Sequence, residues 1–337
     1  MKTRPPAQAG TFYPDTEGAL RTQIHNCFLH PLGPRTIPSI PATPDNQLVG
    51  IIVPHAGYDY SGPVAANSYY RLATSGLRES VIILGPNHTG YGSGVSTMAD
   101  GQWATPLGEV PVNNSLASSI TKLSGLIDVE EEAHRREHSI EVQLPFLQFI
   151  YPRRFQFVPI CMMLQDLETS VEVGKAIAKA AAGTGAMLIA SSDWTHYESQ
   201  ESAKKKDMEA IQAVLEMDEK KFQDTIEENH VSACGYGPVT AVLHASKILG
   251  AKHAKLLSYQ TSGDTSGDKR SVVGYAAIAL RSELILANNL SSDSFIQSPR
   301  KNHPVRRTIR RPRRTSCRDG CQSLLKDRRK AISDWQN

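Results

Sequence analysis

The stretch L-V-G-I-I-V-P-H, residues 48–55, is an apolar run that stops at Pro54 and is followed at once by His55. A run of six residues dominated by Val, Ile and Leu predicts a strand, because it is too short for a typical helix of a globular protein. Four similar runs predict further buried strands, which is typical of a layered α/β fold. They are S-V-I-I-L-G (80–85), F-Q-F-V-P-I-C (155–161), A-M-L-I-A-S (186–191) and V-V-G-Y-A-A-I-A-L (272–280).

Segments with helical patterns lie between these runs. In one of them, Met208, Ile211 and Val214 recur at the spacing of a helix face. Strands that alternate with helices favour a sheet covered by helices. The predicted helices lie at 64–74, 139–150, 168–182, 201–217 and 238–249.

Length and composition narrow the class of protein. The chain has 337 residues, of which 40% are hydrophobic, and this is enough for a sizeable core. No apolar stretch is long enough to predict a membrane span. The amino-terminal segment lacks the apolar centre of a signal peptide, so we expect a cytoplasmic protein. The five cysteines are odd in number and scattered, which argues against a disulfide framework.

Charge is distributed unevenly along the chain. From Pro299 to the end there are 13 Lys and Arg against 3 Asp and Glu, whereas the remainder holds 24 against 31. Apolar periodicity also fades after Leu280. We therefore predict one α/β domain over residues 1–285 and a basic, disordered tail over residues 286–337. Nucleic acid is expected as a partner only through this tail.

Polar residues of catalytic type follow three of the predicted strands almost at once. His55 and His88 each follow one run, and Asp193 and His196 follow a third. Cys234 lies in the glycine-flanked turn C-G-Y-G-P before a predicted helix. Each residue alone has an ordinary explanation, such as a loop histidine, a helix cap or a small buried thiol. Because open α/β sheets bind ligands beyond the carboxyl ends of their strands, the repeated pattern predicts one shared site.

The segment H-R-R-E-H, which starts at His134, fits the H-x-x-E-H signature of inverted zinc peptidases. On one helix, His134 and His138 would share a face and hold Zn²⁺, with Glu137 as the base. Ser139 opposes this hypothesis, because it is a good N-cap for a helix that begins after the motif. Pro145 would also interrupt a longer helix. The zinc peptidase is therefore a minor alternative.

A Gly/Ser-rich stretch with two aspartates, T-S-G-D-T-S-G-D, occupies residues 261–268. It predicts a loop before the last strand. Backbone N–H groups of such a turn could instead bind a phosphate, and Asp264 could reach the strand-end crevice.

Eight motifs in a fixed order resemble those of a known family. The chain resembles the Memo family, the middle component of the AmmeMemoRadiSam gene set. The motifs cover about residues 4–282, and eight in order are far more specific than one. They are R-P-P-A-Q-A-G-T-F-Y-P (4–14), P-H-A-G-Y-x-Y-S-G (54–62), I-L-G-P-N-H (83–88), W-A-T-P-L-G (103–108), E-H-S-I-E-V-Q-L-P-F (137–146), S-S-D-W-T-H-Y (191–197), C-G-Y-G-P (234–238) and S-G-D-x-S-G-D (262–268).

The resemblance implies a three-layer α/β/α fold with a mostly buried central sheet, similar to the class III extradiol ring-cleaving dioxygenases. Those enzymes hold Fe(II) with two histidines and a carboxylate, and use a further histidine as acid or base. Carried over, His55 and His88 stand where the two histidine ligands belong. Cys234 stands where the family has its third ligand, which is a thiolate and suits Cu(I), Zn or Fe.

The resemblance also implies catalytic residues. His196 matches the acid/base histidine, Asp193 lies beside it, and His138 matches a histidine that lines the pocket. Two functions stay open. The first is an oxygen- or redox-active enzyme that uses Fe(II) or Cu(I), with Zn(II) as a further option. The second is a non-catalytic binding module whose crevice holds a metal or a peptide side chain.

Either function implies a small molecule or a peptide as the partner. Neither implies a membrane. The gene set implies a functional link to AMMECR-type and radical SAM proteins.

Overall fold

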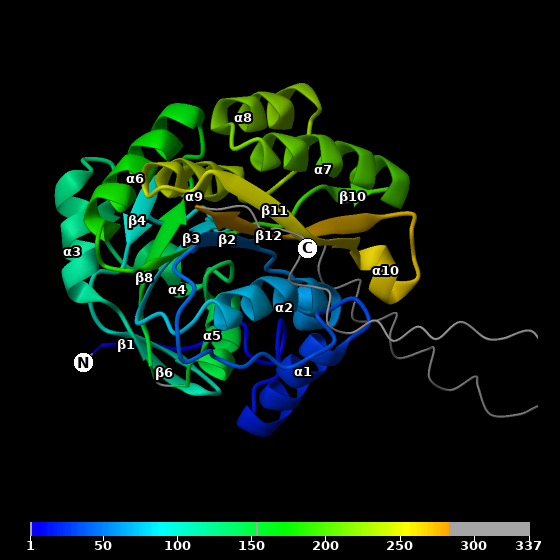
Figure 1. The fold of residues 1–337 in the computed structure, drawn as a ribbon, viewed down its shortest axis with the longest axis horizontal. Coiled ribbons are helices and arrows are strands. Elements are labelled where there is room, and N and C mark those ends of the chain that lie inside the picture. Colours follow the sequence, from blue (N-terminus) through cyan, green and yellow to red (C-terminus); the bar gives the residue numbers. More distant parts are fainter. Residues whose placement is uncertain (1, 153, 283–337) are drawn as a thin grey trace, which may run out of the picture. The chain divides into compact units, whose positions relative to one another are not determined.

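The computed structural model of the protein describes residues 2–152 and 154–282 (Figure 1). A sheet of nine strands runs through this part of the chain, in the order β10-β12-β2-β9-β3-β8-β4-β7, with β11 beside β12. Four parallel strands form its centre. In their spatial order they are β2 (Leu48–Val53), β9 (Met187–Ser191), β3 (Ser80–Pro86) and β8 (Gln156–Met162).

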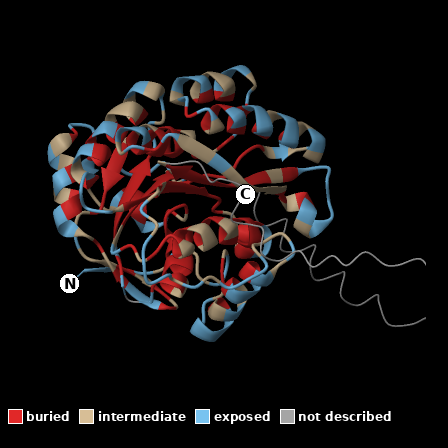
Figure 2. Ribbon diagram, viewed as in Figure 1, coloured by how far each residue is buried: buried red, intermediate tan, exposed pale blue. Residues whose placement is uncertain are grey.

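All five strands predicted from apolar runs are confirmed. The fifth, β12 (Val272–Arg281), pairs with β2 in the antiparallel direction. Nearly every residue of these strands is buried, and Figure 2 shows this burial through the middle of the sheet. Because both faces are covered, each strand reads as a continuous apolar run instead of an alternating one.

Helices cover both faces of the sheet, so the domain has the predicted three layers (Figure 1). One layer contains α3 (Asn114–Leu123), α6 (Leu167–Ala181), α7 (Gln200–Leu215), α8 (Glu219–Glu228) and α9 (Tyr236–Ile248). The other contains α1 (Glu17–Leu29), α2 (Tyr58–Thr74), the 3₁₀ turn η1 (Glu141–Gln143) and α5 (Leu144–Ile150).

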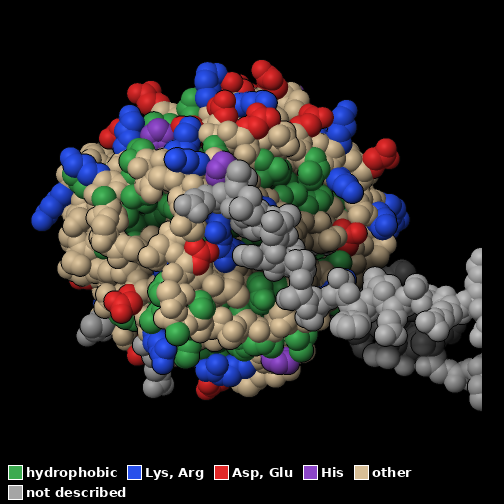
Figure 3. Space-filling view, in the orientation of Figure 1, with side chains coloured by type: hydrophobic (Ala, Val, Ile, Leu, Met, Phe, Trp, Pro, Cys, Tyr) green, Lys and Arg blue, Asp and Glu red, His purple; other side chains and the backbone are tan. Residues whose placement is uncertain are grey.

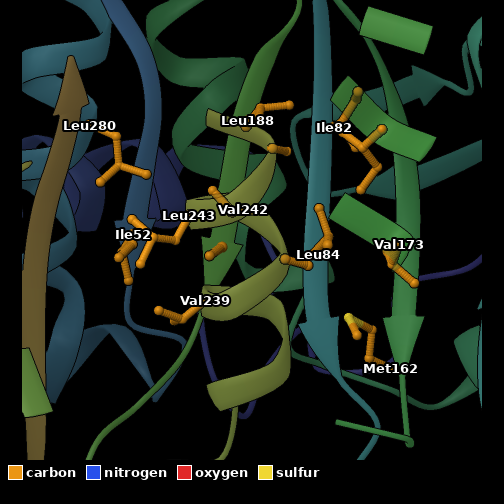
Figure 4. Packing of buried hydrophobic residues seen from close by; sticks show 14 of the residues in the cluster. Ile52, Ile82, Leu84, Met162, Val173, Leu188, Val239, Val242, Leu243 and Leu280 are labelled. Atoms are coloured by element: carbon orange, nitrogen blue, oxygen red, sulfur yellow. The ribbon is translucent and has the colours of Figure 1, made fainter. Parts of the chain in front are cut away.

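Neighbouring side chains of a central strand point into the two different layers. Ile52 packs in the cluster that includes α9, whereas Ile51 packs in the cluster that includes α2 and α5. Figure 4 shows Val239, Val242 and Leu243 of α9 beside strand residues of the first cluster. Burial of one Val, Leu or Ile side chain contributes about 1.5–3 kcal/mol. The two layers therefore hold the strands, and with them the strand ends, in a fixed arrangement.

Shorter elements complete the described part of the chain. The strand β11 escaped prediction, because its polar and apolar residues are mixed and most of them are only partly buried at the edge of the sheet. These elements are β1 (Thr3–Arg4), β4 (Val95–Thr97), β5 (Gln102–Thr105), β6 (Gly108–Pro111), β7 (Asp128–Val129), α4 (Glu132–Arg135), β10 (His196–Glu198), β11 (His253–Thr261) and α10 (Ser262–Ser266).

The helix predicted at 139–150 starts later than expected. A 3₁₀ turn precedes it, and α5 begins at Leu144. Ser139 is not its N-cap, because the Ser139 hydroxyl donates to the Pro86 carbonyl at 2.8 Å. Pro145 lies in the first turn of α5, where a missing N–H leaves no hydrogen bond unmade.

Two other predicted boundaries were wrong. The helix α2 begins six residues before the predicted position 64 and contains Pro63 in its interior. The stretch 261–268 is not only a loop, because α10 forms within it. Asp264 caps this helix, and its Oδ2 accepts the Thr261 N–H at 2.8 Å. A carboxylate used in this way is not available to the strand-end crevice.

The predicted tail at 286–337 lies outside the described residues. Cys27, Cys161 and Cys234 are free thiols, which agrees with the absence of a disulfide framework in the described part of the chain. Between residues 2 and 282, with position 153 left aside, no helix combines the length and apolarity that a bilayer crossing requires.

Candidate metal centre

Three histidine rings meet beyond the carboxyl ends of the parallel strands. His55 follows β2 and His88 follows β3, and their ring centroids are 5.2 Å apart. The ring of His138 lies 5.4 Å from His55 and 4.4 Å from His88. One ring nitrogen of each histidine lies within 4.8 Å of the other two, so the group could hold a metal ion. The structure brings His55 and His88 together, and His138, which the resemblance implies as a pocket-lining histidine, lies in the same group.

Hydrogen bonds determine which nitrogen of His55 is free. Its Nδ1 lies 2.8 Å from the Ser191 hydroxyl, which donates its one proton to the Ser139 carbonyl at 2.6 Å. The same hydroxyl accepts from the Gln143 amide, whose nitrogen is identified by a second bond to the Pro54 carbonyl. The Ser191 oxygen must therefore accept a hydrogen bond from the Nδ1–H of His55. Nε2 of His55 then carries the lone pair.

A carboxylate orients His88 in a similar way. Glu137 accepts the backbone N–H of His88 at 2.6 Å and its Nδ1–H at 2.9 Å, together with the N–H groups of His138 and Ser139 at 2.8 Å each. Burial raises the pKa of Glu137, but His88 and His138 lower it overall to about 2. The carboxyl is therefore ionised, which leaves Nε2 of His88 as the free ring nitrogen.

His138 lies between an aromatic ring and a carboxylate. The Phe12 ring lies 4.6 Å from its ring, and Nδ1 lies 3.3 Å from the Glu137 carboxylate. Burial is the main reason that its pKa is lowered to about 4, so its imidazole is neutral at pH 7. A neutral imidazole can act as a metal ligand.

Cys234 contacts one member of the group. Its Sγ lies 3.1 Å from His55 Nε2 and accepts the backbone N–H of Asp193 at 3.3 Å. Burial raises the pKa of this thiol well above its usual value. Gln165 binds the turn from both sides, donating to the Cys234 carbonyl at 3.0 Å and accepting from Gly237 at 2.8 Å. The turn therefore presents the sulfur directly to a histidine of the group.

Asp193 and His196 lie on the same side as His55. The Asp193 carboxylate accepts the backbone N–H of His55 at 2.8 Å, and burial raises the pKa of Asp193 to about 6. Nδ1 of His196 lies 2.9 Å from the Ser232 carbonyl, which can only accept. His196 therefore also keeps its proton on Nδ1 and has a free Nε2. It is not part of the three-histidine group among the described residues.

The zinc-peptidase hypothesis for H-R-R-E-H was wrong. The helix α4 ends at Arg135, so the two histidines of the signature do not share a helix face. His134 is fully buried 5.7 Å from the Trp103 ring. Glu137 is used to orient His88 instead of activating water.

The amino-terminal segment packs beside the three histidines and is held there by Glu141. The sequence analysis did not predict this contact. The buried carboxylate of Glu141 accepts from Arg4 at 2.6 Å, from the Tyr13 hydroxyl at 2.6 Å and from the Ala7 N–H at 2.8 Å. Phe12 is therefore held beside the histidines. The sequence marks both partners only as separate motifs, R-P-P-A-Q-A-G-T-F-Y-P and E-H-S-I-E, because Glu141 lies more than a hundred residues from Arg4, Ala7 and Tyr13.

Comparison with known proteins identifies the family. The family model described as "Memo-like protein" matches residues 4–279.

The chain belongs to the Memo family.

Among curated proteins, the chain is 49% identical over 280 residues to a MEMO1 family protein of Methanopyrus kandleri. The matched region covers 82% of this chain and 99% of that protein. The chain is 50% identical over 284 residues to a MEMO1 family protein of Methanocaldococcus jannaschii, with 82% and 98% covered. A relative from Sulfolobus acidocaldarius is 47% identical over 279 residues. The predicted tail at 286–337 lies beyond the residues that match the Memo model.

Proposed function

We propose that this Memo protein is a metal-dependent, oxygen- or redox-active enzyme that binds Fe(II) or Cu(I). In this proposal His55 and His88 supply Nε2 ligands and Cys234 supplies a thiolate. The observation that carries the proposal is that free ring nitrogens converge. Nδ1 of His55 is bonded to Ser191 and Nδ1 of His88 is bonded to Glu137, so Nε2 of each ring is free. Metal-binding histidines in proteins usually donate their second nitrogen in this way.

The donor set fits a first-row transition metal. Imidazole suits Zn, Cu and Fe, and a thiolate favours Cu(I), Zn or Fe over Mg or Ca. Metal binding would deprotonate the buried Cys234 thiol, whose pKa is raised in the metal-free site. His138 is the competing third ligand, because its ring lies in the same group. We assign it to the pocket wall, and the experiment below distinguishes the two roles.

The bound metal would supply electron transfer to or from a substrate or O₂. The protein residues would orient the substrate and handle protons. His196 is suited to carry a proton, because its Nδ1–H is held by the Ser232 carbonyl and its Nε2 is free. Asp193, with a pKa raised to about 6, is a second group that can change protonation near neutral pH. Phe12 would give the pocket an apolar wall beside His138.

Metal titration of anaerobically purified protein tests the ligands. We expect about one Fe(II), Cu(I) or Zn(II) per chain, and at least tenfold weaker binding, about 1.4 kcal/mol, in His55→Ala and Cys234→Ser. His134→Ala is the matched control, since this buried histidine lies outside the group. If metal binding weakens in His138→Ala but not in Cys234→Ser, the third ligand is His138 and not the Cys234 thiolate. Unchanged binding in His55→Ala would refute the site.

Oxygen uptake with a panel of catechols tests the enzymatic part. We expect His196→Ala to keep the metal and to lose turnover by ~10²–10⁴-fold, the usual contribution of a general acid or base. Metal binding without uptake by the unmodified protein would favour the alternative, a binding module whose crevice holds a metal or a peptide side chain.

A further inference from the structure

Three arginines surround one aspartate at the edge of the sheet opposite the metal centre. Asp45 precedes β2 and Arg78 precedes β3, so both lie at the amino ends of parallel strands. Arg281 is the last residue of the antiparallel β12, and Arg71 lies in the last turn of α2. This arginine cluster is therefore separate from the site beyond the carboxyl ends.

The aspartate makes contact with all three guanidinium groups. Arg71 Nη2 donates to Asp45 Oδ2 at 2.5 Å, and Arg281 Nη2 lies 3.2 Å from the same oxygen. Arg78 Nη2 donates to the Asp45 carbonyl at 3.1 Å. Arg71 Nη1 also donates to the Thr74 hydroxyl at 3.5 Å, and Arg78 Nη2 donates to the Leu48 carbonyl at 3.4 Å. A guanidinium has five N–H donors, so donors of each arginine remain unused.

Positive charge exceeds negative charge in this cluster. Arginine stays protonated in proteins, so among the described residues three positive charges lie against the carboxylate and carbonyl of Asp45 alone. The carboxyl end of α2 contributes about half a negative charge. Arg78 and Arg281 are each only 8% exposed, and buried charges without partners are costly. On the face of the molecule that Figure 3 shows, many basic side chains lie close to acidic ones.

Arginine N–H donors without partners also indicate that the cluster can accept an anion. The Nε atoms of Arg71, Arg78 and Arg281 are buried and have no hydrogen-bond partner among the described residues. The cluster still reaches solvent, because the side chains of Asp45 and Arg71 are 30% and 18% exposed. A ligand can therefore approach from the side of these two residues.

We propose that the arginine cluster binds a phosphate-type dianion beside Asp45. A tetrahedral oxyanion matches the planar fork of a guanidinium with two oxygens at once, which a chloride ion does not. Two negative charges would also balance the excess positive charge of the cluster. The ligand is either free inorganic phosphate or the phosphoryl group of a small ester.

Calorimetric titration of the full chain with inorganic phosphate tests this site. The protein is first stripped with a chelator, so that phosphate cannot bind through a metal, and sodium chloride keeps the ionic strength constant. We expect one saturable site, with affinity at least tenfold lower in Arg71→Ala and in Arg281→Ala. Arg21→Ala is the matched control, since this exposed arginine pairs with Glu17 on α1. A parallel titration with glycerol phosphate separates the two sources: equal binding means that an ester fits, and no binding means that the site takes the free ion.

Two results would overturn the proposal. One is the absence of saturation by phosphate below about 10 mM in the unmodified protein. The other is an equal affinity in Arg71→Ala and the control. If the alanine variants fail to fold, Arg71→Lys keeps the charge but loses the planar fork, and we expect at least a fivefold loss there. A lysine variant that binds as well as the unmodified chain would count against the site.

Discussion

Replacing Glu137 by glutamine in the metal-free protein tests the carboxylate that orients the histidines. Glu137 accepts four N–H groups, two from His88 and one each from His138 and Ser139. Glutamine keeps the size of the side chain but exchanges one acceptor oxygen for an NH₂ donor. This donor must then face at least one N–H group, and that hydrogen bond is lost.

The pKa of Glu137 gives the expected magnitude. Burial raises it, but His88 and His138 lower it overall from 4.5 to about 2. A difference of this size corresponds to about 3 kcal/mol of folding free energy when the carboxyl is ionised. Because the pKa is lower in the folded chain, this stabilisation is complete above pH 4.5 and is lost as the pH falls through about 2. We expect Glu137→Gln to be less stable by up to about 3 kcal/mol at pH 7, where His138 is neutral and adds no charge of its own, and by only about 1 kcal/mol at pH 3.

Urea unfolding at pH 7, 5, 4 and 3, at constant ionic strength, measures this difference. Glu132→Gln is the control, because Glu132 is exposed and its pair with Arg135 is long at 3.6 Å. We expect the control to change stability by less than about 0.5 kcal/mol at each pH. A loss in Glu137→Gln that stays the same from pH 7 to pH 3 would show that ionisation is not what stabilises the site.

Three further variants test other parts of the structure. We expect His138→Ala to weaken Zn(II) binding at least tenfold if its ring is a ligand, and to affect binding more than His134→Ala in either role; equal losses would contradict the arrangement. Ser191→Ala removes the hydroxyl that accepts the Nδ1–H of His55, so metal affinity of the folded variant should fall by ~10–100-fold, and unchanged affinity in a metal titration would refute the tautomer argument. Deletion of residues 291–337 should shift the melting temperature by less than about 5 °C, and a larger drop in calorimetry would show that the tail packs on the domain.

The strands were predictable because their signal is local. A central strand such as β2 is buried on both faces, and this requires a continuous apolar run at that place in the chain. The edge strand β11 carries no such signal, since most of its residues are only partly buried. The start of α5 also escaped prediction, because Ser139 bonds to Pro86, which lies on another strand.

The sequence by itself determined which polar residues stand at strand ends. Chain direction and the end of an apolar run are local properties, so the positions of His55 and His88 at one edge followed from them. The tertiary structure alone decided which nitrogen of each ring is free. That choice depends on Ser191 and Glu137, which lie 136 and 49 residues away from their histidines. Ser191 reaches His55 because β9 pairs with β2 in the sheet, and Glu137 reaches His88 from the segment between α4 and η1. No local pattern in the chain encodes either arrangement.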